Sequence, residues 1–69
     1  MRYYVCEVWW TKKIDGKTVK GNSELIRVIA RNKNEAAKKA KKEYWSYRRR
    51  KRVPRNIKTH VKIIESGRW

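Results

Sequence analysis

The chain has 69 residues, and a chain of this length buries only about 60% of the surface that its unfolded form exposes. Its 39% hydrophobic and 12% aromatic residues are typical of a folded protein, which excludes a disordered tail. Twenty-one Lys and Arg stand against six Asp and Glu, giving a formal net charge of +15. We therefore expect a single basic domain over residues 1–69 that polyanions bind and stabilise.

The sequence also indicates where in the cell the protein is located. Cys6 has no second cysteine in the chain to pair with, so it is predicted to be a small buried hydrophobe, with an intermolecular disulfide as the alternative. No stretch reaches the roughly 18 apolar residues of a membrane span, and the start of the chain lacks a signal-peptide pattern. The expectation is a soluble intracellular protein without a membrane partner, located in the cytoplasm or nucleoid, or in a host cell if it is viral.

Residues 2–12 are predicted to form a strand, because Tyr, Val and Trp dominate and nothing interrupts the run. Alternation gives this strand two faces. The apolar face, predicted to line the core, carries Tyr4, Cys6, Val8 and Trp10, and the other carries Tyr3, Val5, Glu7 and Trp9.

The segment around Asp15 and Gly16 predicts a hairpin, since glycine adopts positive φ readily. A two-residue turn pairs even-numbered positions of the first strand with odd-numbered positions of the second. A type I turn with a glycine bulge pairs even-numbered positions of both strands. The second is preferred, because it sets Ile26, Val28 and Ala30 of a strand over residues 18–31 beside the predicted core face. The sequence leaves open whether Gly21 and Asn22 add a further bulge that shifts this register.

A helix is predicted to begin after Asn32, which has the spacing of an N-cap to Glu35. It is predicted to end by Arg52, because the residue before Pro54 is disfavoured in the α region. The buried stripe of this helix is Ala36, Ala37, Ala40, Tyr44 and Tyr47.

Residues 56–65 predict a third strand whose apolar positions face the helix. Ile57, Thr59, Val61 and Ile63 alternate there with Lys58, His60, Lys62 and Ile64. The predicted fold class is α+β: a small ββαβ domain with a three-stranded antiparallel sheet of order 2-1-3 and one helix packed on one face. The exposed edge strands are compatible with a homodimer.

Catalytic patterns are weak. The carboxylates are scattered, and His60 has no partners spaced for acid–base work or for zinc. Phosphate-binding loops and nucleophile elbows are absent. The chain is therefore interpreted as a non-enzyme without cofactor or metal.

A basic run, YWSYRRRKRVPR over residues 44–55, is the strongest functional signal. Cations at a helix end also suit the helix dipole, but that accounts for two or three of them and not five in succession. Because Tyr44 and Tyr47 belong to the buried stripe, the predicted contacts from this run are Trp45, Arg48, Arg49, Arg50, Lys51, Arg52 and Arg55.

The sheet face opposite the helix is predicted to be a second contact surface. Exposed rings and cations gather there around one valine: Tyr3, Val5, Trp9, Arg27, Arg31, Lys58, His60 and Lys62. Rings stack on or wedge between bases while cations hold phosphates. The alternative is that a partner subunit or the Trp69 tail covers the rings.

The functional hypothesis is a small nucleic-acid-binding protein of low sequence specificity, with DNA favoured over RNA and duplex over single strands. A basic sheet with aromatic side chains resembles, in style, small archaeal chromatin proteins and the sheet-reading DNA-binding domains of phage integrases, although no diagnostic motif covers the chain. The rival hypothesis is a viral or regulatory interaction module that docks on an acidic protein, with Tyr3, Trp9 and Trp45 as anchors.

Overall fold

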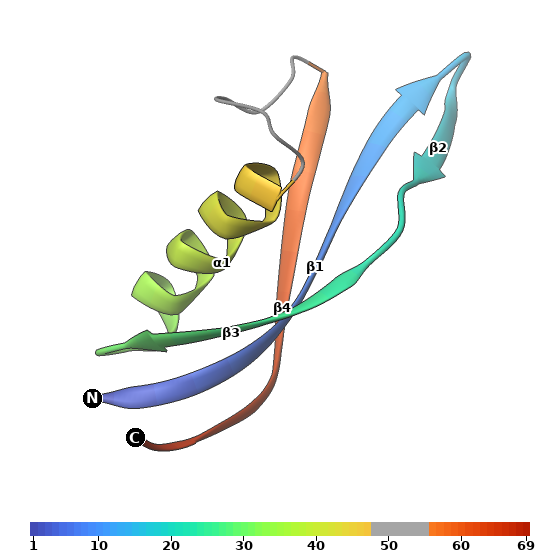
Figure 1. The fold of residues 1–69 in the computed structure, drawn as a ribbon. Helices are drawn as coiled ribbons and strands as arrows, with labels where there is room; N and C mark the ends of the chain where they lie inside the picture. The colour runs from blue at the N-terminus through green and yellow to red at the C-terminus, as the bar shows by residue number, and fades with distance from the viewer. Residues whose placement is uncertain (48–55) are drawn as a thin grey trace.

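The computed structural model describes residues 1–47 and 56–69. Within them the chain forms β1 (Arg2–Ile14), β2 (Lys17–Lys20), β3 (Glu24–Ala30), α1 (Lys33–Tyr47) and β4 (Ile57–Arg68). The strands make one antiparallel sheet, and α1 lies across one face of it (Figure 1). The predicted α+β class is confirmed.

Strand β1 is the centre of the sheet, as predicted. It pairs with β4 from Arg2 to Lys12, so β4 occupies one of its edges along almost its whole length. The other edge pairs with β3 near the start of β1 and with β2 near its end. The order 2-1-3 is therefore confirmed, with the predicted second strand divided into β2 and β3.

The hairpin turn differs from the preferred prediction. Asp15 and Gly16 both have positive φ, at 50° and 77°, which is the signature of a two-residue type I′ turn. Ile14 pairs with Lys17, so even positions of β1 lie opposite odd positions of β2. The preferred glycine-bulge geometry was wrong because the Asp-Gly pair satisfies the tighter turn without an extra residue.

One extra residue between β2 and β3 restores the core register. Thr11 pairs with Lys20, but Val8 pairs with Glu24. Three steps along β1 therefore correspond to four steps along the partner segment, so one extra residue lies within Gly21 to Ser23. The open alternative of an irregularity at Gly21 is thereby confirmed. From there on, even positions of β1 face even positions of β3, as the sequence analysis expected.

Glycine is required at position 21. Its N–H donates a 2.8 Å hydrogen bond to the carbonyl of Trp10. The indole of Trp10 lies directly over Gly21, and a Cβ built there would fall within the ring. The irregular segment is thus held by a large side chain packed on bare backbone.

Helix α1 begins as predicted. The side-chain Oδ1 of Asn32 accepts a 2.9 Å hydrogen bond from the Glu35 N–H, which is an N-cap contact. The Glu35 carboxylate lies 3.3 Å from the Lys39 ammonium one turn later. Ala36 and Ala40 are fully buried, so the helix backbone approaches the sheet closely.

The core lies between α1 and the sheet face that carries the even positions of β1, here named the helix face. Its buried members are Tyr4, Cys6, Val8, Ile26, Val28, Ala30, Ala36, Ala40, Tyr44 and Trp45, with Trp10, Ile57, Val61 and Ile63 packed partly against them. The predicted core face of β1, the buried Cys6 and the inward apolar set of β4 are confirmed. The Tyr47 side chain lies outside the described part.

Strand β4 is longer than predicted and irregular near its end. Cys6 pairs with Ile63 but Val5 pairs with Glu65, so Ile64 is an extra residue in β4. Pairing continues to Arg68 opposite Arg2. Residues 66–68, which lie beyond the predicted strand, therefore belong to the sheet.

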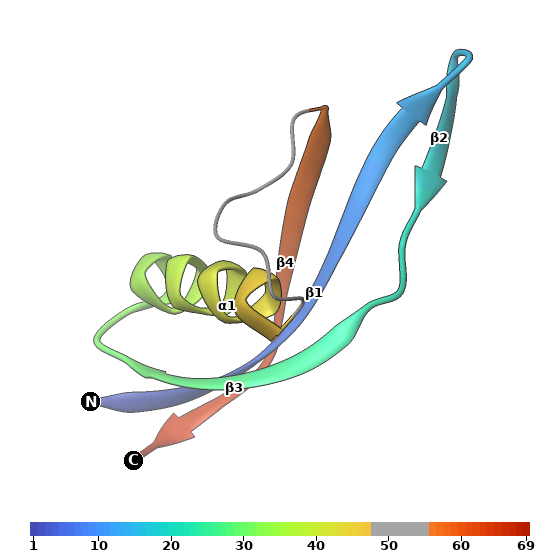
Figure 2. The same cartoon turned by 45° about the horizontal axis from the view of Figure 1, so that its top comes forward.

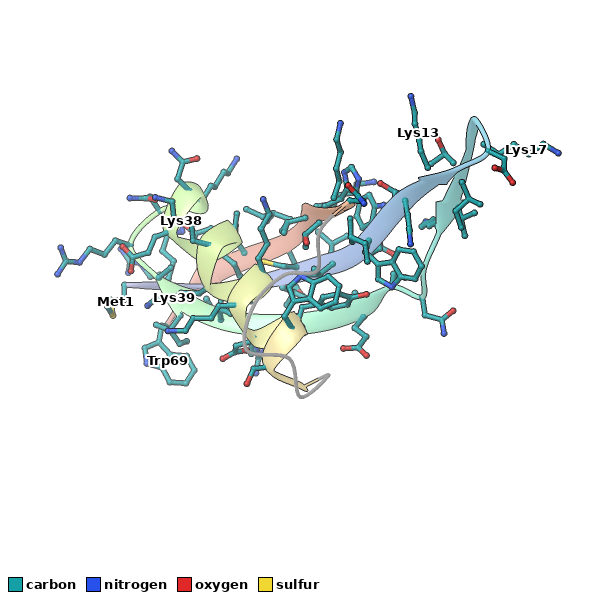
Figure 3. All side chains as sticks on the ribbon, turned by 90° about the horizontal axis from the view of Figure 1, so that it is seen from above. Met1, Lys13, Lys17, Lys38, Lys39 and Trp69 are labelled. Atoms are coloured by element: carbon teal, nitrogen blue, oxygen red, sulfur yellow. The ribbon has the colours of Figure 1, made fainter. Side chains whose placement is uncertain are left out.

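Residues 11–20, here named the arm, project beyond α1. Figures 1 and 2 show this hairpin extending away from the helix, and the molecule measures 44 × 23 × 17 Å. Lys13 and Lys17 lie at its far end, well separated from Lys38 and Lys39 of α1 (Figure 3). Among the described residues, no helix is long and apolar enough to cross a membrane.

Candidate nucleic-acid interface

The basic run is mostly outside the described residues. Its predicted contacts Arg48, Arg49, Arg50, Lys51, Arg52 and Arg55 all fall within residues 48–55. Their role stays a prediction from the sequence.

Trp45 is not a contact residue in this fold. Only 5% of it is exposed, and its ring meets Tyr44 edge-on with 5.2 Å between centroids. Its indole N–H donates a 2.9 Å hydrogen bond to Thr59 Oγ1 on β4. The expectation that Trp45 offers a face to a base was wrong, because the helix stripe is wide enough to bury two adjacent aromatic residues.

Trp9 lies on the uncovered face of the sheet, here named the open face, and it is half-buried. The His60 ring stacks on it with centroids 5.4 Å apart and planes 16° apart, and Lys20 Nζ lies 5.1 Å from its centroid. His60 approaches from β4 and Lys20 from β2, so both ring faces have neighbours. Trp9 therefore offers its edge first, and a stacking base must displace Lys20.

Tyr3 is packed in a similar way at the other end of the open face. The Arg27 guanidinium carbon lies 5.1 Å from its ring centroid. On the β4 side, a Cβ added to Gly67 would lie 2.6 Å from the ring. Both open-face rings are thus half-buried, which gives them a structural role that the sequence analysis did not foresee.

Cross-strand rows reveal where charge accumulates on the open face. In the inner half, defined by the rows of Tyr3, Val5 and Glu7, Arg27 and Glu65 flank Val5 on opposite sides. Lys62 lies directly opposite Glu7. The formal charges of the inner half therefore cancel, although two predicted contacts, Arg27 and Lys62, lie there.

The outer half of the open face, at the base of the arm, is different. Its members are Trp9, Thr11, Lys13, Thr18, Lys20, Lys58 and His60. Lys20 and Lys58 flank Thr11 in one row, and Lys13 faces Thr18 in the next. These rows contain no carboxylate, so the charge surplus of the described open face lies here.

Thr11 and His60 are joined within the outer half. Thr11 Oγ1 lies 2.7 Å from His60 Nε2, and the donor depends on the tautomer of the imidazole. This bond fixes the ring that stacks on Trp9. The cluster is therefore held in place before any ligand arrives.

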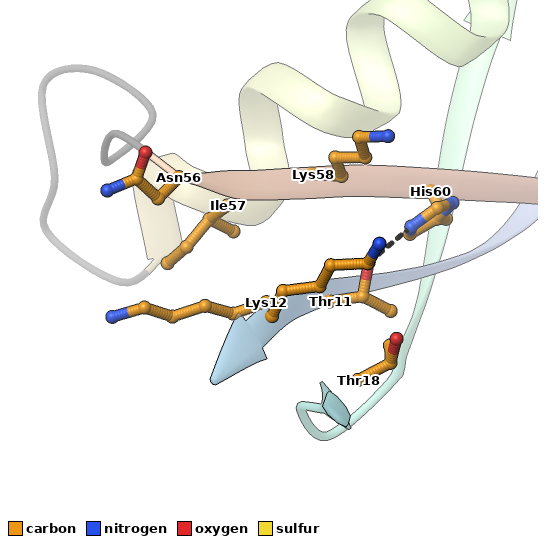
Figure 4. Close-up of a pocket in the computed structure, with 8 residues that line it drawn as sticks. Thr11, Lys12, Thr18, Asn56, Ile57, Lys58 and His60 are labelled. Atoms are coloured by element: carbon orange, nitrogen blue, oxygen red, sulfur yellow. Dashed lines mark hydrogen bonds between the residues drawn. The ribbon is translucent and has the colours of Figure 1, made fainter. Parts of the chain in front are cut away.

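A groove of about 570 Å³ opens where the arm diverges from the start of β4. Its described lining is Thr11, Lys12, Lys13, Thr18, Asn56, Ile57, Lys58 and His60. Figure 4 shows these side chains coming from both sides of the groove, with the Thr11–His60 bond between them. Basic and hydroxyl groups without a carboxylate favour an anionic ligand.

The structure thus gathers only some of the predicted contacts. Trp9, Lys58 and His60 lie together, whereas Arg31 follows β3 at the end of the sheet remote from the arm. Sequence reasoning missed Thr11, Lys13 and Lys20. Alternation from Trp9 was the signal for Thr11 and Lys13, and the Asp-Gly pair was the signal for Lys20, because a two-residue turn places it on the same face.

No described residues form a cluster of three or more His, Cys, Asp or Glu side chains suited to a metal ion. Comparisons of the chain with protein-family models, with curated proteins and with solved structures each find no significant match.

Proposed function

We propose that the protein is a small, non-enzymatic nucleic-acid-binding protein that contacts duplex DNA with low sequence specificity inside a cell. The observation that carries the proposal is the outer half of the open face. Lys13, Lys20 and Lys58 surround Trp9 and His60 there without a carboxylate among them. The arginines of residues 48–55 add further charge to the same small domain.

Charge supports nucleic acid as the ligand. Even without residues 48–55, the described residues hold fifteen Lys and Arg against six Asp and Glu. Phosphate neutralisation by such groups supplies sequence-independent affinity through release of counterions. Self-repulsion in the free protein falls when a polyanion binds, so the ligand also stabilises the fold.

The shape of the arm supports a duplex. A two-stranded β-ribbon fits the major groove, which is about 12 Å wide. The arm carries lysines and threonines but no Asn, Gln or Arg in residues 11–20, the side chains that most often read base edges. Lysine contacts to phosphate position a protein without specifying a sequence.

The test is a salt-series titration of the purified protein with duplex DNA, single-stranded DNA, RNA and heparin, followed by tryptophan fluorescence. Contact with about six phosphates predicts that log K falls against log salt with a slope near −5 for duplex DNA. The duplex is expected to bind most tightly. Binding that hardly changes with salt rejects the proposal.

A protein partner is the second candidate, and the inner half of the open face favours it. Leu25, opposite Glu7, is 66% exposed, and Ile64, the unpaired extra residue of β4 next to these rows, is 51% exposed. An apolar, charge-balanced surface suits a protein more than a phosphate backbone. Equal binding to all four polyanions indicates simple polycation behaviour and favours this candidate, with an acidic protein as the partner.

A further inference from the structure

The row formed by Lys20, Thr11 and Lys58 crosses three strands at the base of the arm. We propose that this row is a phosphate seat, in which two lysines clamp one backbone phosphate of a nucleic acid above the Thr11 hydroxyl. The inference rests on the proposed function and assigns it a location.

The spacing of the row suits a phosphate. Adjacent strands lie about 4.8 Å apart, so the Cα atoms of Lys20 and Lys58 are about 10 Å apart across Thr11. A lysine side chain is long and flexible enough to turn inward from either side, and each ammonium brings three N–H donors. The Thr11 hydroxyl lies between them and can donate to the phosphate when His60 Nε2–H is the donor in the Thr11–His60 bond.

Electrostatics separates this row from other lysines of the chain. Lys39 already pairs with Glu35 at 3.3 Å and donates to the Ile29 carbonyl at 2.8 Å. Lys62 faces Glu7 across the sheet. The row of Thr11 has no carboxylate, and neither of the two open-face rows beside it has one. An arriving backbone phosphate therefore meets two ammonium groups with no carboxylate competing for them, and its single negative charge lowers the repulsion between them.

The seat has a built-in reporter. Lys20 Nζ rests 5.1 Å from the Trp9 centroid, and Thr11 is bonded to the His60 ring that stacks on the same indole. A lysine over a ring at an exposed position is held less strongly than a lysine that bonds to a charged oxygen. Phosphate is therefore expected to draw Lys20 away from Trp9 and alter its fluorescence.

The first test needs no nucleic acid. NMR spectra of the full-length protein are recorded while inorganic phosphate replaces chloride at constant ionic strength. Resonances of Thr11, Lys58 and His60 are expected to shift saturably, while those of Lys38 and Lys41 on the exposed helix surface stay almost unchanged. Absent or uniform shifts overturn the seat.

The second test removes charge at the seat. The double variant Lys20→Gln, Lys58→Gln is compared with Lys38→Gln, Lys41→Gln, which loses the same net charge from α1. Loss of the single phosphate that both seat lysines contact lowers the steepness of the duplex salt slope by about 0.9, and the control lowers it by much less. Circular dichroism confirms that both variants fold.

The outcomes distinguish the seat from the proposed function. Equal effects of the two double variants overturn the seat and indicate diffuse charge. If the seat variant keeps the salt slope of the wild type, the phosphate seat is overturned, but the proposal of duplex binding is not. Saturable phosphate shifts without duplex binding by the wild type overturn nucleic acid as the source of the phosphate and with it the proposed function.

Discussion

Replacing Trp45 by Ala should destabilise the domain severely. The residue is 5% exposed, so nearly all of an area of about 150–250 Å² leaves water on folding. At about 25 cal/mol per Å² this burial contributes roughly 4–6 kcal/mol, and buried Trp→Ala substitutions cost about 3–5 kcal/mol. A domain of this length holds only about 3–10 kcal/mol in total. The variant is expected to be largely unfolded or close to its midpoint at room temperature.

Urea unfolding followed by circular dichroism measures this loss. Trp69→Ala is the matched control, because that tryptophan is 76% exposed and its removal should change the free energy of unfolding by no more than about 0.5 kcal/mol. Trp45→Phe keeps a buried ring and should fold, losing the bond to Thr59 and part of the buried ring volume. Its duplex affinity should match the wild type. A stable Trp45→Ala variant with weakened duplex binding would refute the assignment of Trp45 to the core.

Three further substitutions or modifications test the fold. Gly21→Ala forces the Trp10 ring to move and should cost about 1–3 kcal/mol, read from thermal unfolding. Asn32→Ala removes the N-cap bond and should cost about 1 kcal/mol in urea unfolding, whereas the exposed Asn34→Ala should cost under about 0.5 kcal/mol. Burial raises the pKa of the Cys6 thiol, so the folded state keeps its proton where the unfolded state loses it. This contribution to stability is complete below about pH 8.5 and declines above it, a decline that Cys6→Ala should lack; alkylation of Cys6 should require unfolding.

Local patterns were sufficient to predict the core. Alternation in β1 assigned Cys6 and Val8 to the buried face, because a strand with one wholly apolar side has one stable orientation. The spacing of Asn32 and Glu35 located the helix start, because the N-cap contact spans only three residues. Such features depend on neighbours in the sequence.

The open face was less predictable, because its properties depend on which residues meet across strands. The sequence places Trp9 outside the core but does not show that Lys20 and His60 flank its ring. It places Lys62 and Glu7 on one face but does not show that they are opposite each other. A list of cations therefore overstates the contact surface where carboxylates balance them.

The turn at Asp15 decides the chemistry of the arm. With the preferred bulge geometry, Lys20 would face Lys12 on the helix face of the sheet, and Val19 would lie on the open face. The observed two-residue turn places Lys20 opposite Thr11 and Val19 opposite Lys12 instead. The extra residue before β3 then returns the apolar set to the core. The two one-residue shifts compensate each other, so they leave the core unchanged while they assemble the row of Lys20, Thr11 and Lys58. The core was therefore predicted correctly although this row was not.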